Sequence, residues 1–416
     1  MKKKVYFKTF GCRTNLYDSQ VMIGALNEYD VTQNEEEADA IVINSCTVTN
    51  GADTHVRTYI SHIEKTTGAK IFLTGCGAHT KGESLLKNGR VHGVFGQSEK
   101  LKIDTLLSEE KPYYNPGDLN HIDNAIVDDF VGKSRAFIKV QEGCDFRCSY
   151  CIIPFVRGDA RSMDEQKILD QISQLALNGF GEFILTGTNV GSYGKGNNSS
   201  MAKLMKRISQ IRGVRRIRLG SIEPIQITDE FKELLDEPWL EKHLHIALQH
   251  TSPKMLKLMN RRNVYKQDKE LFEFLANKGF AIGTDYITGH PGESEEIWSE
   301  AIRNLHQLPL THLHAFTYSK RDGTPSCHMK PEVNGKVAKQ RLHEIEAIIE
   351  EKNYDFRKNN NNNLDVLIES QRSDGLYQGF DQYFNKILVN SKEDLLGNWL
   401  SIDKYKIEKG NNYAEL

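Results

Sequence analysis

The chain has 416 residues, enough for two or three domains with a sizeable core, and its 26% charged and 9% aromatic residues are ordinary for a globular protein. The formal net charge of -2 gives no bulk attraction for nucleic acid, so any RNA would have to be bound by a local basic patch. No apolar stretch approaches the length of a membrane span, and the apolar run after the initial Met-Lys-Lys-Lys is too short for a signal peptide.

The first part of the chain, residues 1–107, alternates short apolar runs with helical stretches. Strands are predicted at 5–10, 40–44 and 70–74. Helices are predicted at 17–28 and 52–65. Strands that are separated by helices predict a parallel sheet, so we expect an α/β domain of the flavodoxin or Rossmann type.

Each of these three predicted strands runs into a cysteine: Cys12, Cys46 and Cys76. Parallel strands place their carboxyl ends on one edge of the sheet, so three thiols that are far apart in sequence should converge there. Taken singly, each cysteine could be a small buried apolar residue. Because all three share one structural position, we expect a joint site, and the small residues beside them would let the backbone approach a bulky group.

Residues 108–134 carry Pro, Gly, Asp and Asn with little periodicity and are predicted to be a linker. The alternation resumes in 135–358, the predicted central domain. Its expected strands are 137–141, 182–186, 216–219, 245–249, 281–287 and 312–317. Its expected helices are 164–178, 200–211, 228–236, 254–259, 267–277 and 294–307. Six such repeats fit an open (βα)6 partial barrel, and a closed eight-stranded barrel would need two more.

A long polar helix is expected at 334–358, followed by five asparagines that form a low-complexity hinge. Strand-like runs separated by turn residues follow at 364–369, 385–389 and 399–402. We therefore predict a small all-β module over 359–416. This tail has more acidic than basic residues, so by charge alone it is a poor contact for RNA.

Directly after the predicted strand 137–141, Cys144, Cys148 and Cys151 stand in a CxxxCxxC spacing. A structural zinc site needs four protein ligands, and no fourth Cys or His lies nearby. Three thiolates can instead hold an iron-sulfur cube in which one iron keeps an exchangeable position. The odd count of seven cysteines argues for a reducing compartment and metal ligation, so we expect a cytoplasmic protein.

The CxxxCxxC run with Tyr150 before its last cysteine resembles the radical S-adenosylmethionine superfamily, and the whole chain resembles its methylthiotransferases. The resemblance implies S-adenosylmethionine and two 4Fe-4S clusters. Cys144, Cys148 and Cys151 would hold the cluster that cleaves S-adenosylmethionine to a radical. The other three thiols, of Cys12, Cys46 and Cys76, would hold an auxiliary cluster that presents sulfur. The C-terminal module would be the TRAM barrel of that family.

The resemblance also suggests residues around the cofactor, since related enzymes bind it at the carboxyl ends of the barrel strands. These candidates are Tyr150, Thr186, Gly187, Ser221, Glu223, Gln249 and Arg261. Tyr150 would stack on the adenine. The turn at Thr186 and Gly187 occupies the place of the methionyl-amino site, although it lacks the usual pair of glycines. Arg261 could bind a carboxylate with both arms of its guanidinium. An ordinary loop hydrogen bond is the alternative for each.

Among the branches of the family, the segments 9–19, 44–50 and 141–158 most resemble the one that acts on N6-threonylcarbamoyladenosine. That branch adds a methylthio group to carbon 2 of this nucleoside at position 37 of tRNA. Methylthiolation of N6-isopentenyladenosine, or of an aspartate in a ribosomal protein, is the alternative, and the acidic tail would suit a basic ribosomal protein. A cluster-bearing RNA-binding or redox-sensing protein without catalysis is a more distant alternative. The expected partners are the anticodon stem-loop of tRNA and an electron donor such as flavodoxin or ferredoxin, with the chain as a monomer.

Two further groups of residues invite a function. Basic residues cluster in 212–218 and 254–269 and could hold an anticodon stem, although a solvated helix face explains the second group equally well. Histidines cluster in 243–250 and 312–314, and strand alternation places His243 with His245, and His312 with His314, on common faces. A metal site is possible there, but the six cysteines already account for the metal chemistry.

Overall fold

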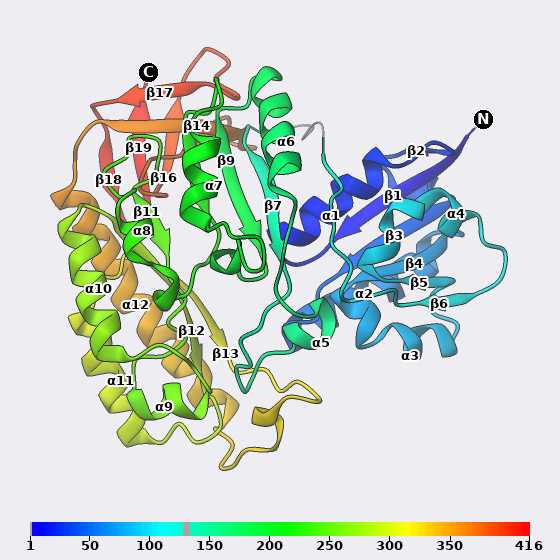
Figure 1. Ribbon diagram of the computed structural model, residues 1–416, viewed down its shortest axis with the longest axis horizontal. Helices are drawn as coiled ribbons and strands as arrows, with labels where there is room; N and C mark the ends of the chain where they lie inside the picture. Colours follow the sequence, from blue (N-terminus) through cyan, green and yellow to red (C-terminus); the bar gives the residue numbers. More distant parts are fainter. Residues whose placement is uncertain (1, 128–133) are drawn as a thin grey trace.

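The computed structural model describes residues 2–127 and 134–416, which form three units (Figure 1). An N-terminal α/β unit, drawn in blue and cyan, lies beside a central unit of strands and helices. A small C-terminal β module, drawn in red, packs on the central unit. No helix in the described part of the chain is both long and apolar enough to cross a bilayer.

The N-terminal unit contains a parallel sheet in the order β2-β1-β3-β4-β5-β6, as expected for a flavodoxin or Rossmann type of domain. Its strands are β1 (Lys3–Thr9), β2 (Tyr29–Val31), β3 (Ala40–Ser45), β4 (Lys70–Gly75), β5 (Gly93–Phe95) and β6 (Tyr113–Asn115). Its helices are α1 (Arg13–Gly24), α2 (Asn50–Thr66), α3 (Gly82–Lys87) and α4 (Ile103–Ser108). The three predicted strands are β1, β3 and β4. The unpredicted β6 pairs with β5 from within the stretch that had been predicted to be a linker.

Helix α1 begins four residues before its predicted start, directly after Cys12, and ends at Gly24 instead of residue 28. The reason for the early end lies outside the helix. The carboxylate of Asp104 accepts the backbone N–H groups of Asn27 and Glu28 at 2.8 and 3.1 Å. These two backbone N–H groups are therefore satisfied without a further turn of helix, and α1 can end at Gly24.

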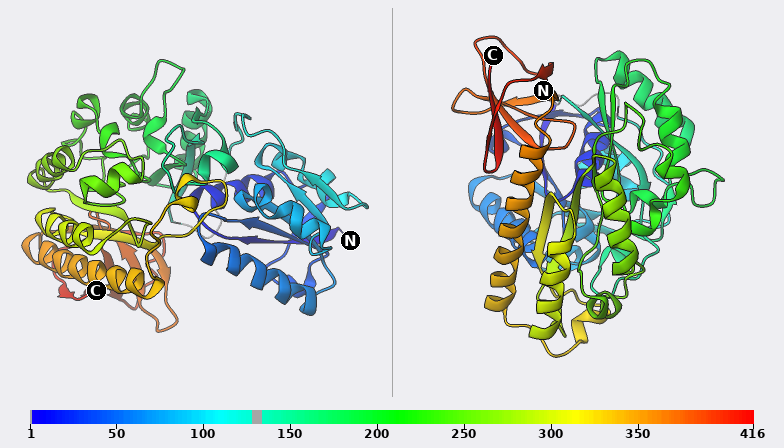
Figure 2. Two further views of the ribbon diagram at one scale, coloured as in Figure 1. Left: turned by 90° about the horizontal axis from the view of Figure 1, so that it is seen from below. Right: turned by 90° about the vertical axis from the view of Figure 1, so that its left-hand side faces the viewer.

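The central unit is the expected partial barrel, with β8 added to its first edge. Its strands are β7 (Ala136–Glu142), β8 (Arg161–Ser162), β9 (Glu182–Gly187), β10 (Arg216–Leu219), β11 (His243–His245), β12 (Ala281–Thr288) and β13 (His312–Thr317). Its helices are α5 (Ile153–Arg157), α6 (Glu165–Leu177), α7 (Met201–Ile208), α8 (Asp229–Lys232), α9 (Pro253–Leu258), α10 (Tyr265–Asn277) and α11 (Glu295–Gln307). The order is β8-β7-β9-β10 and then β11-β12-β13, with single bridges between the two sheets at Ile217 and Ile222. Figure 2 shows the helices on the outside of this curved wall.

Strand β11 differs from its predicted position, since it covers 243–245 and not 245–249. After His245 the chain makes only isolated bridges, of Ile246 with Ile222 and of Gln249 with Tyr286. Gln249 has a φ of 69°, a left-handed conformation that is uncommon for any residue with a Cβ. This conformation is incompatible with a regular strand.

Helix α12 (Gly335–Asn359) leads into the C-terminal module. The strands of the module are β14 (Leu364–Gln371), β15 (Tyr377–Phe380), β16 (Lys386–Asn390), β17 (Trp399–Ile402), β18 (Lys406–Glu408) and β19 (Asn411–Glu415). They form one sheet in the order β17-β14-β15-β16-β19-β18, antiparallel except for the pair β16 and β19. The prediction of an all-β module is confirmed, and β15, β18 and β19 are additional to the predicted strands.

The main hydrophobic core lies between the strands of the central unit and helices such as α6, α7 and α10. Tyr17 and Val21 of α1 belong to this core, although α1 is part of the N-terminal unit. Tyr17 is fully buried, and its hydroxyl donates to the carbonyl oxygen of Ala125 at 2.7 Å and to Gln171 at 3.2 Å. The first two units are therefore packed together around α1.

Candidate iron-sulfur active site

The cysteines of the N-terminal unit follow the carboxyl ends of β1, β3 and β4. Cys12 is exposed, Cys46 is partly buried and Cys76 is buried. Burial and the nearby charges of Cys76 and Cys12 raise the pKa of the Cys46 thiol to about 11. The three sulfur atoms are thus close enough for their thiolates to repel one another. A bound cation would compensate this repulsion.

Close approach of the backbone at this edge depends on glycine. Gly11 has a φ of 100°, and a Cβ there would lie 2.6 Å from Cβ of Cys46. Gly75 has a φ of 83°, and a Cβ there would lie 2.4 Å from the carbonyl oxygen of Ser45. A larger residue at either position would push apart the loops that carry the thiols.

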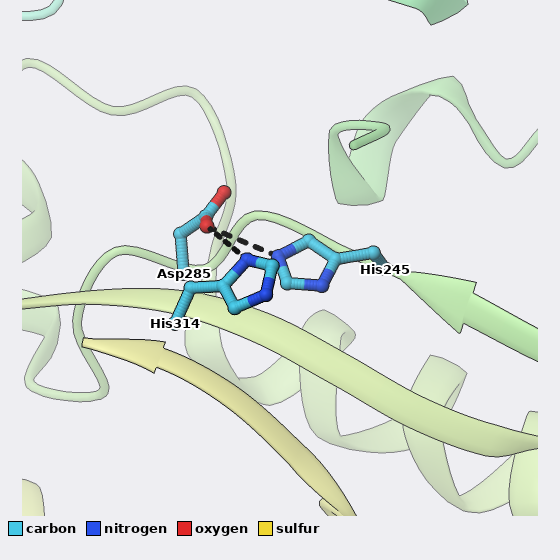
Figure 3. Close-up of side chains that lie close together, drawn as sticks. All are labelled: His245, Asp285 and His314. Atoms are coloured by element: carbon cyan, nitrogen blue, oxygen red, sulfur yellow. Dashed lines mark ion pairs between the residues drawn. The ribbon is translucent and has the colours of Figure 1, made fainter. Parts of the chain in front are cut away.

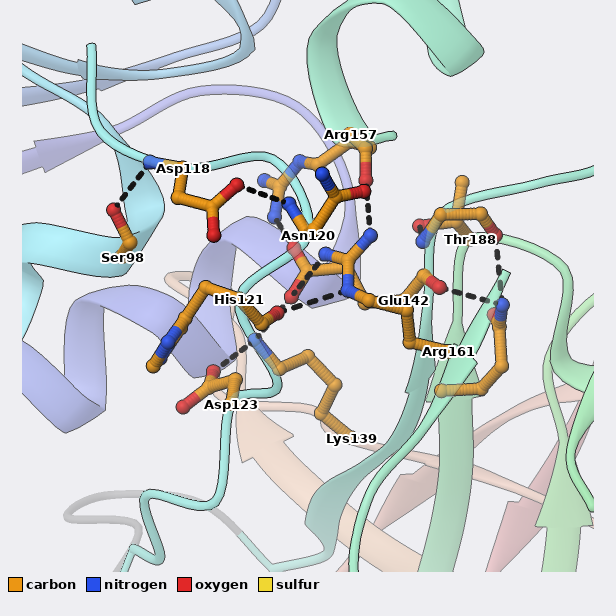
Figure 4. A network of polar contacts seen from close by, with 12 residues as sticks. Ser98, Asp118, Asn120, His121, Asp123, Lys139, Glu142, Arg157, Arg161 and Thr188 are labelled. Carbon is orange, nitrogen blue, oxygen red and sulfur yellow. Dashed lines mark hydrogen bonds and ion pairs between the residues drawn. The ribbon is translucent and has the colours of Figure 1, made fainter. Parts of the chain in front are cut away.

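Arg157, at the end of α5, joins this thiol site to the central unit. It is 3% exposed, and its Nε–H donates to Sγ of Cys76 at 3.2 Å. Its two terminal nitrogens donate to Asn15, Asp18 and Glu142 at 2.5 to 2.9 Å. Figure 4 shows Arg157 beside Glu142, with the buried pair Lys139 and Asp123 in the same polar network. Arg157 lies in the segment 141–158 that carries the family resemblance, but it was not among the predicted site residues.

The charges of this network balance one another in the interior. Burial opposes ionisation of Asp18, but Lys100, Lys139 and Arg157 hold the pKa of its carboxyl well below the usual range. Burial alone would lower the pKa of the Lys139 ammonium, yet Asp123 and Asp18 raise it well above the usual value. Asp18 and Lys139 are therefore charged, and the cation of Arg157 is held beside the sulfur of Cys76.

The second set of thiols lies on the loop that follows β7. Cys144, Cys148 and Cys151 are partly buried, and burial with the charges of the other two raises the pKa of the Cys151 thiol to about 12. Sγ of Cys144 accepts the backbone N–H of Phe146 at 3.4 Å and the side-chain amide of Asn189 at 3.5 Å. Hydrogen bonds to sulfur are one means by which proteins tune iron-sulfur clusters.

Arg261 and Glu223, two predicted residues, bind each other beside this second set. The guanidinium holds both carboxylate oxygens of Glu223, with one N–O distance of 2.9 Å. The same group lies 3.6 Å from Sγ of Cys148. Burial and the charge of Asp285 raise the pKa of Glu223, while Arg261 opposes this rise. The carboxylate that Arg261 binds with both arms is thus that of Glu223.

The other predicted cofactor-binding residues differ in how far they are buried. Tyr150 packs with Met255 and Met259 and makes an edge contact with His290 at 6.4 Å. Thr186 is buried at the end of β9, and a Cβ at Gly187 would lie 2.8 Å from Gln141. Ser221 is exposed, and Gln249 is partly buried with its left-handed backbone. All of them lie near the carboxyl ends of the barrel strands.

A cavity of about 280 Å³ lies next to the residues that follow one cysteine of each set. Thr47 and Ile152, which directly follow Cys46 and Cys151, line it. The charged residues of its lining are Asp53, Lys81, Lys320, Arg321 and Asp322. Arg321 is 6% exposed and donates to Asp53 at 2.6 Å. Its Nε has no hydrogen-bond partner among the described residues. A buried N–H without a partner suits an anionic ligand.

The two sets of sulfur donors fit iron-sulfur cubes better than single zinc ions. Zinc holds thiolates at about 2.3 Å, so two sulfurs on one ion lie at most about 4.6 Å apart. Within the described residues, neither set forms a group whose ligand atoms all lie within 4.8 Å of one another. Thiolates are the usual ligands of 4Fe-4S clusters, and a set of three leaves one iron free.

The first basic cluster is divided between the surface, where Arg212 and Arg215 are exposed, and the interior. Arg216 and Arg218 are 3% and 2% exposed. They donate to Glu182, Glu241 and Asp365, because they close the base of the barrel and attach the C-terminal module. In the second cluster, Arg261 binds Glu223. Arg212 of the first cluster, and Lys254, Lys257, Arg262 and Lys266 of the second, are exposed, so their contact with phosphate stays a prediction.

An open βα barrel with a three-thiol loop after its first strand, joined to a parallel-sheet unit with three further thiols, has the architecture of a radical S-adenosylmethionine enzyme. Residues 138–305 match the Radical SAM superfamily, and residues 4–96 match the uncharacterized protein family UPF0004. Membership of the superfamily implies S-adenosylmethionine and a 4Fe-4S cluster. The radical S-adenosylmethionine methyltransferase TsrM of Kitasatospora setae has a similar fold, with a TM-score of 0.62 over 79% of this chain and 77% of that one at 16% identity.

Relatives of similar length define the family more closely. A protein of Helicobacter pylori J99, provisionally named as a methylthiotransferase, is 52% identical over 99% of both chains. Threonylcarbamoyladenosine tRNA methylthiotransferase MtaB of Bacillus subtilis is 33% identical over 99% of this chain and 95% of its own. The tRNA-2-methylthio-N(6)-dimethylallyladenosine synthase of Wolinella succinogenes is 32% identical over 95% of both. The chain belongs to the radical S-adenosylmethionine methylthiotransferases and is an enzyme.

Proposed function

We propose that this enzyme adds a methylthio group to carbon 2 of N6-threonylcarbamoyladenosine at position 37 of tRNA in the cytoplasm. The observation that carries the proposal is the cavity that Lys81, Lys320 and Arg321 line together with Asp53 and Asp322, next to the residues that follow Cys46 and Cys151. The threonylcarbamoyl group bears a carboxylate, which the unpartnered Nε–H of Arg321 and the ammonium groups of Lys81 and Lys320 suit. The similarity to MtaB over the whole length supports the same substrate.

In this proposal Cys144, Cys148 and Cys151 hold one 4Fe-4S cluster, and Cys12, Cys46 and Cys76 hold a second. When bound, the first supplies the electron that cleaves S-adenosylmethionine, and the second supplies a site for the sulfur group. Arg157 and Arg261 each place a fixed cation beside one set of sulfurs. Tyr150, Thr186, Gly187, Ser221, Glu223 and Gln249 border the first site and position S-adenosylmethionine. The donor of electrons is a flavodoxin or ferredoxin, and the chain acts as a monomer.

The dimethylallyladenosine branch is the second candidate, because its members are almost as similar as MtaB. A dimethylallyl group is a hydrocarbon and gains nothing from the cations of the cavity. An aspartate of a ribosomal protein would also bring a carboxylate to the cavity. Nucleoside analysis of tRNA distinguishes this substrate from threonylcarbamoyladenosine.

Nucleoside mass spectrometry of tRNA from cells with and without the gene tests the substrate. We expect loss of the methylthio form of threonylcarbamoyladenosine and its return with the wild-type gene. Cys46→Ala should leave cleavage of S-adenosylmethionine largely intact and abolish methylthio transfer, whereas Cys148→Ala should abolish both. Loss of the methylthio form of dimethylallyladenosine, or an unchanged profile, would contradict the proposal.

A further inference from the structure

A second kind of metal-binding arrangement lies inside the barrel. The ligand atoms of His245, Asp285 and His314 all lie within 4.8 Å of one another, and in the described part of the chain no other three His, Cys, Asp or Glu residues do so. Figure 3 shows the two imidazoles and the carboxylate turned toward one another from three strands. None of these residues is among the predicted ligands of the clusters or of S-adenosylmethionine, although the charge of Asp285 acts on Glu223.

The register of the sheet brings the three residues together. Asp285 of β12 pairs with His314 of β13, and His245 of β11 pairs with Gly283, two residues before Asp285. A Cβ at Gly283 would lie 2.7 Å from Nδ1 of His245 and 2.9 Å from Nε2 of His243. The absence of a side chain at Gly283 therefore makes the space in which the imidazole of His245 lies.

The distances between these ligand atoms are those of a coordination sphere. Nε2 of His245 lies 3.0 Å and Nδ1 of His314 lies 3.6 Å from the same carboxylate oxygen of Asp285. Two donors that are each about 2.1 Å from one ion lie about 3.0 Å apart at a right angle and about 3.4 Å apart at a tetrahedral angle. An ion could therefore bind with little movement of the three side chains.

His245 lies close to the carboxylate of Asp285 without the angle of a regular hydrogen bond. This residue is 7% exposed, and its Nε2 has no hydrogen-bond partner among the described residues despite the oxygen at 3.0 Å. The oxygen lies away from the direction of the ring N–H. Two neighbouring ligands of one metal ion show the same geometry: their donor atoms are close together, but each lone pair points at the ion.

We propose that His245, Asp285 and His314 bind a divalent transition-metal ion that is separate from the iron-sulfur clusters. Two imidazoles and one carboxylate are a donor set for zinc, ferrous iron, manganese and similar ions. The side chain of His314 is 61% exposed, so the ion can enter from solvent. Three protein ligands leave coordination positions free for water or for an oxygen ligand.

The neighbouring histidines do not complete the set. His243 stacks on Phe384 of the C-terminal module at 5.2 Å, and His312 makes an edge contact with His243 at 4.7 Å. His250, the fifth histidine of the predicted cluster, lies 3.1 Å from Glu293. The proposed site thus contains two of the five histidines.

Metal analysis of the full-length protein with its clusters reconstituted tests the site, because bound iron keeps zinc away from the six cysteines. After removal of loosely bound metal and dialysis against micromolar zinc, we expect about one zinc per chain in addition to the iron. His314→Ala and Asp285→Asn should each lower the zinc content at least about tenfold while the iron content stays unchanged. His312→Gln, on the same strand and face, is the matched control and should keep its zinc.

Manganese gives a second measurement that does not depend on thiols, since Mn²⁺ prefers oxygen and imidazole ligands. The EPR signal of free Mn²⁺ should decrease on addition of wild-type protein and of His312→Gln, but not of His314→Ala. Wild-type protein that takes up neither zinc nor manganese would overturn the proposal. Equal binding by wild type, His314→Ala and Asp285→Asn would overturn it as well. These readouts do not involve tRNA, so they are independent of the proposed function.

Discussion

Each set of thiols has one buried arginine beside it, and carboxylates hold that arginine in place. Arg157 donates to Cys76 and is held by Asp18 and Glu142, while Arg261 lies near Cys148 and is held by Glu223. A cluster with thiolate ligands is an anion, so these guanidinium groups lower the cost of its burial. Both contacts are between residues that are distant in sequence.

Arg157→Ala should lower the free energy of unfolding by about 3 kcal/mol, because it leaves the buried carboxylates of Asp18 and Glu142 without their partner. Urea denaturation followed by circular dichroism measures this change. Arg147 is the control, since its ion pair with Asp159 is exposed. Arg147→Ala should change stability by less than about 0.5 kcal/mol. Equal effects of the two substitutions would contradict the structural role of Arg157.

His290 makes stability depend on pH. Burial lowers the pKa of its imidazole to about 4, and its nitrogens lie 2.9 Å from the carbonyl oxygen of Pro291 and 2.8 Å from the hydroxyl of Ser326. Below pH of about 6.5 the unfolded chain binds a proton that the folded chain does not, so stability falls as the pH is lowered toward 4. By pH 5 this imidazole should account for a loss of about 2 kcal/mol.

His290→Gln should therefore lose about 2 kcal/mol less than the wild type between pH 7 and pH 5, although it is less stable at pH 7. Urea denaturation at the two pH values measures the difference. The exposed His306 provides the control, since His306→Gln should keep the wild-type dependence. An unchanged dependence in His290→Gln would show that His290 does not resist protonation in the folded state.

At the scale of the element, β17 attaches the C-terminal module to the central unit. Trp399 at the start of this strand lies under the guanidinium groups of Arg215 and Arg216, at 4.2 and 4.7 Å from the ring centre. Gly181 allows this contact, because a Cβ there would lie 3.1 Å from the indole nitrogen. Asp365 of β14 adds ion pairs with both arginines.

Trp399→Ala should raise the population of molecules in which the C-terminal module is detached, because each cation–π contact contributes about 1 kcal/mol. A loss of about 2 kcal/mol corresponds to a roughly 30-fold larger detached population. Limited proteolysis at the asparagine run 359–363 measures this population. Leu396→Ala removes an apolar side chain of the same module that is 50% exposed and should leave the cleavage rate unchanged. Equal rates for Trp399→Ala and wild type would contradict the attachment.

The elements that the sequence predicts well are those with enough residues to show a period or an apolar run. Strands β10 and β13 were predicted with their observed bounds, and β12 nearly so. Strands β2, β5 and β6 have three residues each, too few for a pattern, and they become strands only by pairing with a neighbour. The spacing of the cysteines likewise made them recognisable in the sequence. The position of Arg157 beside Cys76 depends on contacts between residues that are distant in sequence.

At the scale of the whole molecule, helix α1 joins two units that the sequence separates. Tyr17 and Val21 lie in the core of the central unit, and Asp18 binds Lys139 of β7 at 2.6 Å. The sequence predicted two domains with a linker because chain order hides which face of a helix packs against which unit. The buried contacts of α1 couple these units energetically.

The N-terminal and central units should therefore unfold in one transition in differential scanning calorimetry. Tyr17→Ala should lower the midpoint of this transition for both units, because it removes about 3 kcal/mol of packing from their common core. Tyr114, which is 38% exposed, is the control, and Tyr114→Ala should leave the midpoint nearly unchanged. Two separate transitions in the wild type would contradict the coupling.

The position of α1 also restricts how chimaeras with relatives can be made. A junction in 108–134 would appear to exchange a complete unit, but the incoming chain would bring a foreign α1 into the packing around Tyr17 and Lys139. A graft that keeps 13–24 from the recipient, and exchanges only the strands and loops that carry the N-terminal thiols, leaves this packing intact. Substrate preference in such hybrids would then report on the grafted loops and not on a damaged core.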